Sequence, residues 1–379
     1  MIYLDNGATS FPKPKGMTYI MEDCMLHYCG NPGRSGHAMS MKTGEKIYEA
    51  RKQVAKLFSI KNPGRLLFTK NTTESLNLAM YGFLRNGDHV VTTSMEHNSV
   101  LRPLKALEDR GVQHSIVCGN IEGCVSGQAI GNAITEKTRL IVMTAASNVT
   151  GSIMPIKEVA GIAKEKGIPL LLDAAQAAGC MPLNVEELGI SMMAFPGHKG
   201  LLGPLGTGCL YVSEEIELQP LLYGGTGTES RSRLQPADFP EGFEAGTVNA
   251  PGIIGLGYAA SVVEKVGIHA IAYHERQLIC QFDNAIRNMN CVDLYGPVSE
   301  QKTGISLFNI RGIECEEVAD RLNREFGIAV RSGYHCAGLA HRTIGTWDTG
   351  AVRLSVGPFN TGKDIKRAVD AVWKISQKK

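Results

Sequence analysis

Short apolar runs alternate with longer amphipathic segments through most of the chain. The runs are rich in Leu, Val, Ile and Met, and their length suits buried strands better than helices. They predict strands over Leu66–Thr69, His89–Thr93, His114–Val117, Leu140–Thr144, Pro169–Asp173, Met192–Phe195 and Gly208–Val212. The segments between them have helical spacing and predict helices over Glu74–Leu84, Ser99–Arg110, Gln128–Ile134 and Ile156–Lys166. Apolar strands separated by helices are typical of a parallel sheet covered on both faces, so we expect an α/β domain.

The pattern changes after about Gly252 and predicts a smaller α+β domain. Its elements are a long helical stretch over Ile253–Met289, an apolar run over Gly304–Ile310, a helix over Glu316–Glu325, a short run at Ile328–Val330 and a last helix over Lys363–Ser376. Pro12–Lys15 marks the crossing of the first residues between the two domains. We therefore expect a large domain over residues 14–260 and a small one over residues 261–379 together with 1–13.

Length and composition agree with two globular domains. The chain has 379 residues, of which 43% are hydrophobic and 20% charged, so it can bury a sizeable core and is not intrinsically disordered. With 39 Lys+Arg against 37 Asp+Glu, the net charge of +2 gives no general attraction for nucleic acid or anionic membranes. We expect neither as a partner.

We also expect no transmembrane segment and no secretion signal. The uncharged stretch over residues 140–156 is interrupted by Thr, Ser and Asn, and a bilayer span needs about 20 apolar residues. The N-terminal residues have no basic start and no apolar run. These features predict a cytoplasmic protein.

The ten cysteines include no Cys-x-x-Cys pair, which argues against a disulfide scaffold and against zinc. Cys24 and Cys29 lie close together, but only His27 is near as a further ligand. We predict that most of the cysteines are buried and reduced, and that they form no metal site.

Asp173 ends one predicted strand and Lys199 follows another, at the edge of the sheet where α/β proteins bind ligands. A Lys beside glycines in a partly dry crevice can lose its proton and form a Schiff base with a carbonyl. An Asp that ends a buried strand needs a cation or several donors, and the protonated ring nitrogen of pyridoxal phosphate is such a cation. The alternative is an Asp–Lys pair that merely closes a loop.

The segment from Leu66 to Glu74 predicts a strand that turns into a helix, with Asn71 and Glu74 spaced as a capping box. Such a helix start offers backbone N–H groups, a positive dipole end and the hydroxyls of Thr72 and Thr73, which together suit a phosphate group. The alternative is that this segment is only a good helix cap.

Taken in order, these and further motifs resemble the class V aminotransferase-like group of fold type I pyridoxal-phosphate enzymes, most closely the cysteine desulfurases and selenocysteine lyases. The resemblance covers nearly the whole chain. It rests on Tyr3–Thr9, Asn31–Ser40, Phe68–Asn77, Met95–His97, Ser147–Gly151, Asp173–Gln176, Gly197–Lys199, Phe243–Asn249, Arg331–Cys336 and Val352–Arg353. It implies an aspartate-aminotransferase-like fold with a mainly parallel seven-stranded sheet in the large domain.

The resemblance also implies a pyridoxal 5′-phosphate cofactor and the residues that bind it. Lys199 is expected to hold the cofactor and to move protons at the substrate Cα, and Asp173 to pair with the ring nitrogen. The other expected cofactor contacts are Gln176 at the ring hydroxyl, His97 stacked on the ring, Thr72, Thr73 and His198 at the phosphate, Asn148, and Thr247 reaching the phosphate from a neighbouring subunit. A homodimer with shared active sites follows. The alternatives are a loop histidine at His97 and a Gly-Thr turn at Thr247 that needs no ligand.

For the substrate, the resemblance places Asn148 and Arg353 at the carboxylate and Arg34 at the entrance. Arg353 could instead be a strand residue whose charge reaches water. Cys336 decides the reaction, because a desulfurase needs a nucleophilic thiol and an aminotransferase does not. Its loop, with Arg331 and His335 nearby, resembles the short cysteine loop of the selenocysteine-lyase-like branch, and nearby positive charge favours a thiolate. The alternative is that Cys336 is an unremarkable cysteine.

We therefore expect an L-cysteine desulfurase that yields L-alanine and a Cys336 persulfide, which an acceptor protein or thiol would collect. Two alternatives stay open: a selenocysteine lyase, and a non-catalytic scaffold in sulfur trafficking. The sequence departs from the family at Pro196, where many relatives have Ser or Thr, at Gly33 in place of His, at Val248 in place of Pro, and over residues 337–348. These departures bear on substrate preference more than on the cofactor.

Overall fold

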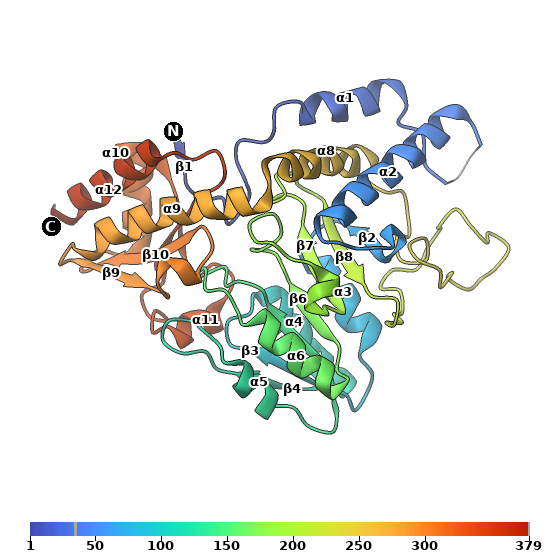
Figure 1. Ribbon diagram of the computed structural model, residues 1–379, viewed down its shortest axis with the longest axis horizontal. Coiled ribbons are helices and arrows are strands. Elements are labelled where there is room, and N and C mark those ends of the chain that lie inside the picture. The colour runs from blue at the N-terminus through green and yellow to red at the C-terminus, as the bar shows by residue number, and fades with distance from the viewer. Residues whose placement is uncertain (34–35, 378–379) are drawn as a thin grey trace.

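The computed structural model describes residues 1–33 and 36–377. Its largest element is a seven-stranded sheet in the order β2-β8-β7-β6-β5-β3-β4 (Figure 1). The strands are β2 (Leu66–Thr69), β3 (His89–Thr93), β4 (Gln113–Val117), β5 (Thr138–Thr144), β6 (Leu170–Asp173), β7 (Met192–Pro196) and β8 (Gly208–Val212). Within this sheet β8 runs antiparallel to both neighbours, and the other pairings are parallel. The predicted α/β fold is confirmed, and each predicted strand of this sheet is present within two residues of its expected limits.

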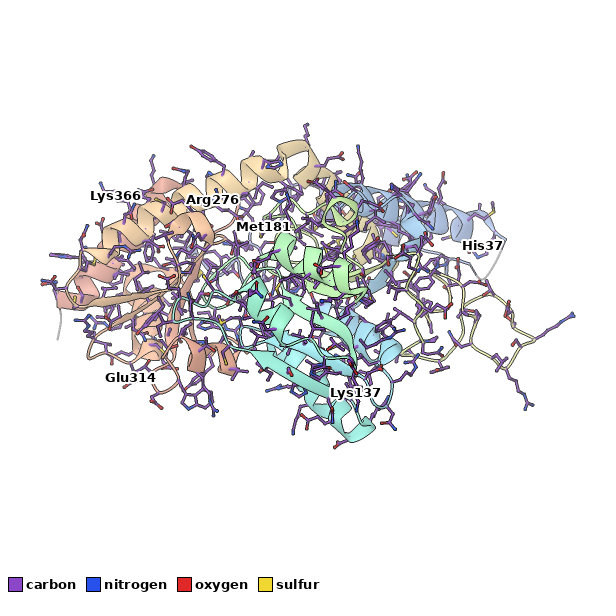
Figure 2. All side chains as sticks on the ribbon, turned by 60° about the horizontal axis from the view of Figure 1, so that its bottom comes forward. His37, Lys137, Met181, Arg276, Glu314 and Lys366 are labelled. Carbon is purple, nitrogen blue, oxygen red and sulfur yellow. The ribbon has the colours of Figure 1, made fainter. Side chains whose placement is uncertain are left out.

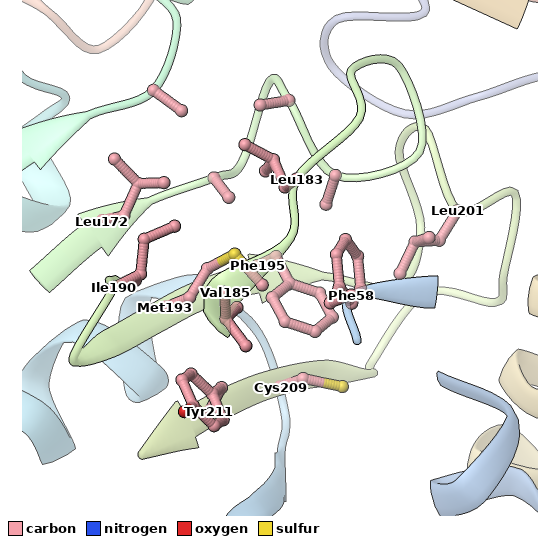
Figure 3. Close-up of a cluster of buried hydrophobic side chains, with 14 of the residues drawn as sticks. Phe58, Leu172, Leu183, Val185, Ile190, Met193, Phe195, Leu201, Cys209 and Tyr211 are labelled. Carbon is pink, nitrogen blue, oxygen red and sulfur yellow. The ribbon is translucent and has the colours of Figure 1, made fainter. Parts of the chain in front are cut away.

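Helices cover both faces of the sheet, as the apolar strands require. Leu170 and Leu172 of β6 pack into one core, whereas Leu171 between them packs into the core on the opposite face. Figure 3 shows the first core around Leu172 and Phe195, where the ring of Phe195 lies 4.7 Å from that of Phe58. The helices of this part are α1 (Met17–His27), α2 (Ala38–Leu57), α3 (Thr72–Phe83), α4 (Asn98–Leu107), α5 (Gly127–Asn132), α6 (Ile156–Lys166), α7 (Val185–Leu188) and α8 (Ala250–Val266).

The C-terminal part forms a second core on a four-stranded antiparallel sheet, in the order β12-β13-β10-β9. Its elements are α9 (Ile268–Arg287), β9 (Val292–Tyr295), β10 (Ile305–Ile310), α10 (Cys315–Phe326), β11 (Ile328–Ala329), β12 (Arg331–Gly333), α11 (Gly338–Thr343), β13 (Ala351–Ser355) and α12 (Gly362–Gln377). At the N-terminus, β1 (Ile2–Tyr3) pairs in parallel with β11. This pairing ties the first residues to the C-terminal part, although the exact domain limits stay a prediction.

The structure differs from the sequence pattern in the long helical stretch after Gly252. This stretch forms two helices, α8 and α9, which meet at Gly267, where φ is +90°. Glycine takes this backbone conformation without the steric cost that a side chain would bring. The pattern also does not predict α1, α2 or α11. Side chains fill the space between the layers (Figure 2), and none of the helices in the described ranges combines the length and apolarity that a membrane crossing needs.

Candidate active site

A cavity of about 250 Å³ lies where the C-terminal ends of the parallel strands meet the C-terminal part of the chain. Most of the residues that the sequence singles out line it together: Thr72, Thr73, His97, Asn148, Asp173, Gln176, His198, Lys199 and Arg353. Other lining residues, which the sequence did not place at the cofactor site, are Gly7, Ala8, Asn71, Ser99, Thr144, Ala175, Arg331 and His335. Segments that are far apart in the sequence therefore form one polar cavity.

Lys199 follows β7 in a tightly held loop. The loop is fixed because the His198 carbonyl accepts hydrogen bonds from Ser10 N (3.0 Å) and Lys13 Nζ (2.9 Å). Burial and the positive charge of Arg353 lower the pKa of Lys199 to about 8, and Asp173 opposes both effects in part. A larger fraction of Lys199 is therefore an uncharged amine near neutral pH than for an exposed lysine.

Asp173 ends β6 and is 2% exposed. Its Oδ1 accepts a hydrogen bond from Ala175 N at 2.9 Å. Burial raises the pKa of Asp173, and the Ala175 N–H and the charge of Lys199 offset this in part. A cationic group in the cavity would stabilise the carboxylate form of Asp173.

The N-terminus of α3 opens onto the same cavity. Asn71 caps the helix, with its Oδ1 accepting from Glu74 N at 3.0 Å, and the Glu74 carboxylate accepts from Lys70 N at 2.6 Å. The Asn71 side chain thus accepts from the backbone N–H of the third helical residue, Glu74. The backbone N–H groups of Thr72 and Thr73 remain available for another acceptor. A phosphate group suits this position because the helix dipole is positive there.

His198, beside the same helix end, has a buried Nδ1 without a hydrogen-bond partner among the described residues. Burial lowers the pKa of His198 to about 4, so its ring is neutral at pH 7. Buried polar atoms normally have partners. An anionic group with several oxygens, bound at the helix end, fits this unpaired atom.

His97 caps α4 with its side chain. Its Nδ1 accepts from Ser99 N at 3.0 Å, which leaves the proton of the neutral ring on Nε2. Burial and the charge of Lys199 lower the pKa of His97 to about 4. His97 therefore offers a neutral, firmly oriented imidazole to the cavity.

Arg353 lies on β13 and is 1% exposed. Its Nη1 donates to the Asn148 carbonyl at 2.8 Å and its Nη2 to Asp5 Oδ1 at 3.0 Å, while its buried Nε has no partner in the described part of the chain. The guanidinium group is thus held between the N-terminal segment and the loop that follows β5. It supplies a fixed positive charge that fits a carboxylate in the cavity.

Cys336 is exposed and lies at the rim, beside two cavity-lining residues, Arg331 and His335. Its Sγ is 3.5 Å from Arg331 Nη2, and its carbonyl accepts from Asn98 N at 2.8 Å. Both His335 (φ +52°) and Cys336 (φ +58°) adopt left-handed backbone conformations, which non-glycine residues avoid without support from their surroundings. The loop therefore holds the thiol in a defined place next to a positive charge.

Among the described residues, two predicted site residues do not line the cavity of this chain, Thr247 and Cys336. Thr247 is exposed, and its Oγ1 accepts from Asn31 Nδ2 at 3.4 Å. Arg34 lies outside the described residues. In the ranges 1–33 and 36–377, three or more His, Cys, Asp or Glu side chains nowhere gather in a group that could hold a metal ion.

A second, smaller cavity of about 30 Å³ shares Lys199 and Gln176 with the first, and the sequence pattern did not single out its other residues. Glu275 and Cys180 line it, and the Cys180 thiol donates a hydrogen bond to the Glu275 carboxyl. Glu275 is 3% exposed, and burial raises its pKa to about 8. The sequence contains a signal for the burial of Glu275. Glu275 is four residues after Ile271 and three before Leu278, so it lies on the apolar stripe of α9.

The raised pKa of Glu275 predicts that the stability of the protein depends on pH. An acid whose pKa is higher in the folded state than its ordinary value binds more protons when folded, so stability falls as pH rises from about 4.5 to 8. Between pH 6.5 and 8 we expect the free energy of unfolding to fall by up to about 1.4 kcal/mol per pH unit for one such group. Glu96, also buried with a pKa of about 8, contributes in the same direction.

Urea unfolding of the cofactor-free protein at pH 6.5 and pH 8 measures this effect. Glu275→Gln keeps the size of the side chain and removes its titration, so its loss of stability over this range should be clearly smaller than that of the unchanged protein. Equal losses in the two proteins would show that Glu275 does not titrate in this range.

The chain matches the family described as aminotransferase class-V over residues 2–368. A probable cysteine desulfurase of Methanothermobacter thermautotrophicus is 37% identical over 382 residues, which cover 99% of this chain and 94% of that relative. A cysteine desulfurase of Escherichia coli is 31% identical over 387 residues, which cover 99% of this chain and 93% of that relative.

Solved structures give the same result. The apo structure of the cysteine desulfurase from Thermococcus onnurineus NA1 has a TM-score of 0.94 at 34% identity and covers 99% of this chain and 94% of that one. An E. coli cysteine desulfurase in the S-sulfonic acid form has a TM-score of 0.88 at 27% identity, with 99% and 94% coverage. The protein therefore belongs to the aminotransferase class-V family, whose members depend on pyridoxal phosphate.

Proposed function

We propose that the protein is a pyridoxal-phosphate-dependent L-cysteine desulfurase that forms L-alanine and a persulfide on Cys336. The observation that carries the proposal is a single cavity that joins Lys199 and Asp173 to the loop of an exposed thiol. The relatives reported above, which are named cysteine desulfurases, support it.

The cavity fits the cofactor in three places. Lys199 would hold its aldehyde carbon, Asp173 and Gln176 would contact the ring, and His97 would stack on it. Thr72, Thr73 and His198 would bind its phosphate at the start of α3, where Pro196 supplies no hydroxyl. When bound, the cofactor draws electrons away from the Cα of an attached amino acid.

Lys199 and His97 handle the protons. With a pKa of about 8, Lys199 is partly an uncharged amine at neutral pH and can take the proton from the substrate Cα. His97, a neutral imidazole with its proton on Nε2, assists this transfer. Because Arg353 and Asn148 are held together by a 2.8 Å hydrogen bond, they form one rigid unit for binding the substrate carboxylate.

Cys336 takes the sulfur. Its thiolate attacks the substrate Sγ, so that a sulfur–sulfur bond forms and the bond between Cβ and Sγ breaks. The electron pair of the broken bond stays with the carbon skeleton and is protonated, which yields alanine. The sum is one cysteine and one enzyme thiol giving one alanine and one enzyme persulfide, so that no external oxidant or reductant is needed. A thiol or an acceptor protein then collects the sulfur from the exposed Cys336.

Absorbance spectroscopy of the cofactor-loaded protein, combined with amino-acid analysis, tests this proposal. Adding L-cysteine should change the absorbance of the cofactor and release L-alanine. L-Serine has the same carboxylate and amine but no sulfur, and should give no alanine. An unchanged spectrum with L-cysteine, or release of pyruvate in place of alanine, would contradict the proposed reaction.

The proposed assembly is a homodimer with shared active sites. Exposed apolar side chains on α2, namely Met39, Met41 and Tyr48, support it. So does the long segment between β8 and α8, which projects away from the main sheet in Figure 1 and exposes Tyr223 and Leu234. In such a dimer Thr247, which does not line the cavity of its own chain, would reach the phosphate site of the neighbouring subunit.

Analytical ultracentrifugation should therefore give a dimer mass at micromolar concentration. Tyr48→Asp should weaken the dimer, because it places a charge on the face of α2 that the proposed dimer would bury. Tyr273→Asp on α9 is the matched control at another exposed tyrosine. A monomer that binds the cofactor fully would contradict shared sites.

We also propose a cytoplasmic location. The protein has free cysteines throughout its described residues, and a catalytic thiol needs a reducing compartment.

A further inference from the structure

Two buried histidines lie in contact beside the Cys336 loop. His335 is 2% exposed and lines the cavity, and His341 on α11 is fully buried. Their rings stack with centroids 5.4 Å apart, and His335 Nδ1 lies 3.2 Å from His341 Nε2. On the far side, His341 Nδ1 lies 2.7 Å from Thr346 Oγ1. The mechanism proposed above uses neither His341 nor Thr346.

The hydrogen bonds that link Thr346, His341 and His335 all run in one direction. His335 Nε2 faces the Arg331 carbonyl at 3.4 Å, and a carbonyl only accepts, so Nε2 carries the proton and Nδ1 accepts. His341 must then donate from Nε2 to His335, and its own Nδ1 accepts from the Thr346 hydroxyl. Both rings are neutral in this arrangement, and burial, the main cause, lowers the pKa of both histidines, that of His341 to about 4.

This row of hydrogen bonds leads to the groups proposed to bind the substrate and to accept its sulfur. The His335 carbonyl accepts from Asn148 Nδ2 at 2.6 Å, and Asn148 in turn accepts from Arg353. Arg331, whose carbonyl faces His335, places its Nη2 3.5 Å from Cys336 Sγ. His335 therefore connects the proposed carboxylate-binding residues, Asn148 and Arg353, to the loop that carries the Cys336 thiol.

We propose that His341 is a positioning residue for Cys336. Its Nε2–H fixes the ring of His335, and the fixed ring holds the loop in its left-handed conformation with the thiol beside Arg331. The same contact keeps Asn148 in place beside Arg353. The consequence for catalysis rests on the proposed desulfurase function, whereas the placement of the thiol does not.

His341 lies in the segment that follows Cys336, on α11. This segment supports the cysteine loop from behind with a buried hydrogen-bond donor. Breaking the contact would leave His335 Nδ1 buried without a donor, a state that proteins avoid. The loop would then relax, and the thiol would leave Arg331.

The test compares two substitutions at one position. His341→Gln places an amide N–H where the Nε2–H was, and His341→Leu fills similar space without a donor. The rate of Cys336 alkylation by iodoacetamide, followed by peptide mass spectrometry, reports the placement of the thiol without requiring turnover. Alkylation of Cys29, an exposed thiol on a distant part of the chain, is the internal reference.

We expect His341→Leu to slow Cys336 alkylation relative to Cys29 by about tenfold, because Sγ is then no longer held beside the Arg331 guanidinium group. We expect His341→Gln to stay within about twofold of the unchanged protein, since the donor is retained. In turnover, KM for L-cysteine should rise in the leucine variant only, with unchanged cofactor absorbance in both. Equal rates in the leucine variant and the unchanged protein, or equal losses in both variants, would overturn the proposal.

If His341→Leu does not fold, Thr346→Val and Thr346→Ser carry the test. Valine removes the hydroxyl that donates to His341 and keeps the shape, whereas serine keeps the hydroxyl. Slower alkylation in the valine variant alone supports the proposal, and the same rate in both variants overturns it. A chain that shows these effects on alkylation but no turnover of cysteine would refute the proposed function and leave the positioning role intact.

Discussion

Replacing Lys199 with alanine is expected to abolish turnover of L-cysteine. Lys199 lines both cavities and is the one lysine of the main cavity within the described residues. Loss of its proton transfer alone should lower the rate by about 10²–10⁴-fold. The loss of covalent cofactor binding adds to this, so that turnover should fall to background. The measurement is alanine release by protein supplied with excess pyridoxal phosphate.

The absorbance of the same variant separates folding from chemistry. Lys199→Ala should lack the band of the lysine-bound cofactor and should show the circular dichroism of the unchanged protein. Lys137→Ala is the matched control, because Lys137 is exposed (Figure 2) and directly precedes β5, whose other end, Thr144, lines the cavity. Retention of alanine release in Lys199→Ala would remove Lys199 from the mechanism.

Replacing Cys336 with alanine is expected to separate cofactor binding from sulfur transfer. Cys336 lies outside the residues that line the cavity, so cofactor absorbance should be unchanged. Persulfide formation from L-cysteine should stop, because no other thiol takes the place of Sγ beside Arg331. Sulfide release in the presence of a reductant should fall at least about a hundredfold, as expected for loss of a nucleophile.

Cys118→Ala provides the control for this prediction, since Cys118 is also an exposed thiol and lies outside the loop. It should keep the full rate of sulfide release. Undiminished release by Cys336→Ala would show that another group, or the solvent, takes the sulfur.

The sheet was predictable because its strands depend on local patterns. Continuous apolar runs such as Leu170–Leu172 can only be buried on both faces, and this fixes a covered parallel sheet. By contrast, α2 carries many charged side chains on its exposed face, so no run of apolar residues marks it. The break at Gly267 depends on one backbone angle that the spacing of apolar residues on either side does not reveal.

The site was predictable as far as its motifs are contiguous. Asp173 and Lys199 follow strands, and the ends of parallel strands meet at one edge of a sheet, so that their meeting follows from the pattern. The contacts that tune the site join residues far apart in the sequence. Asp5 meets Arg353 because the N-terminal segment pairs with the C-terminal part, and His335 meets Asn148 because the C-terminal part packs on the large sheet. No spacing along the chain contains that information.

The buried acid Glu275 shows a further limit. The position of Glu275 on an apolar stripe is visible in the sequence, yet its closeness to Lys199 is not, because the two residues come from different elements that meet only in the folded protein. The expected effects of His341 and Thr346 have the same origin. Both residues belong to a short segment, and their role depends on its packing behind the His335 ring.

The most direct test of the desulfurase mechanism is the mass of the peptide that contains Cys336, measured after a single turnover with L-cysteine and alkylation of the products. We predict that this peptide gains the mass of one sulfur atom, that the peptides of the other nine cysteines do not, and that one L-alanine appears for each sulfur gained. Alanine formed without sulfur on Cys336, or sulfur found on another cysteine, would contradict the mechanism.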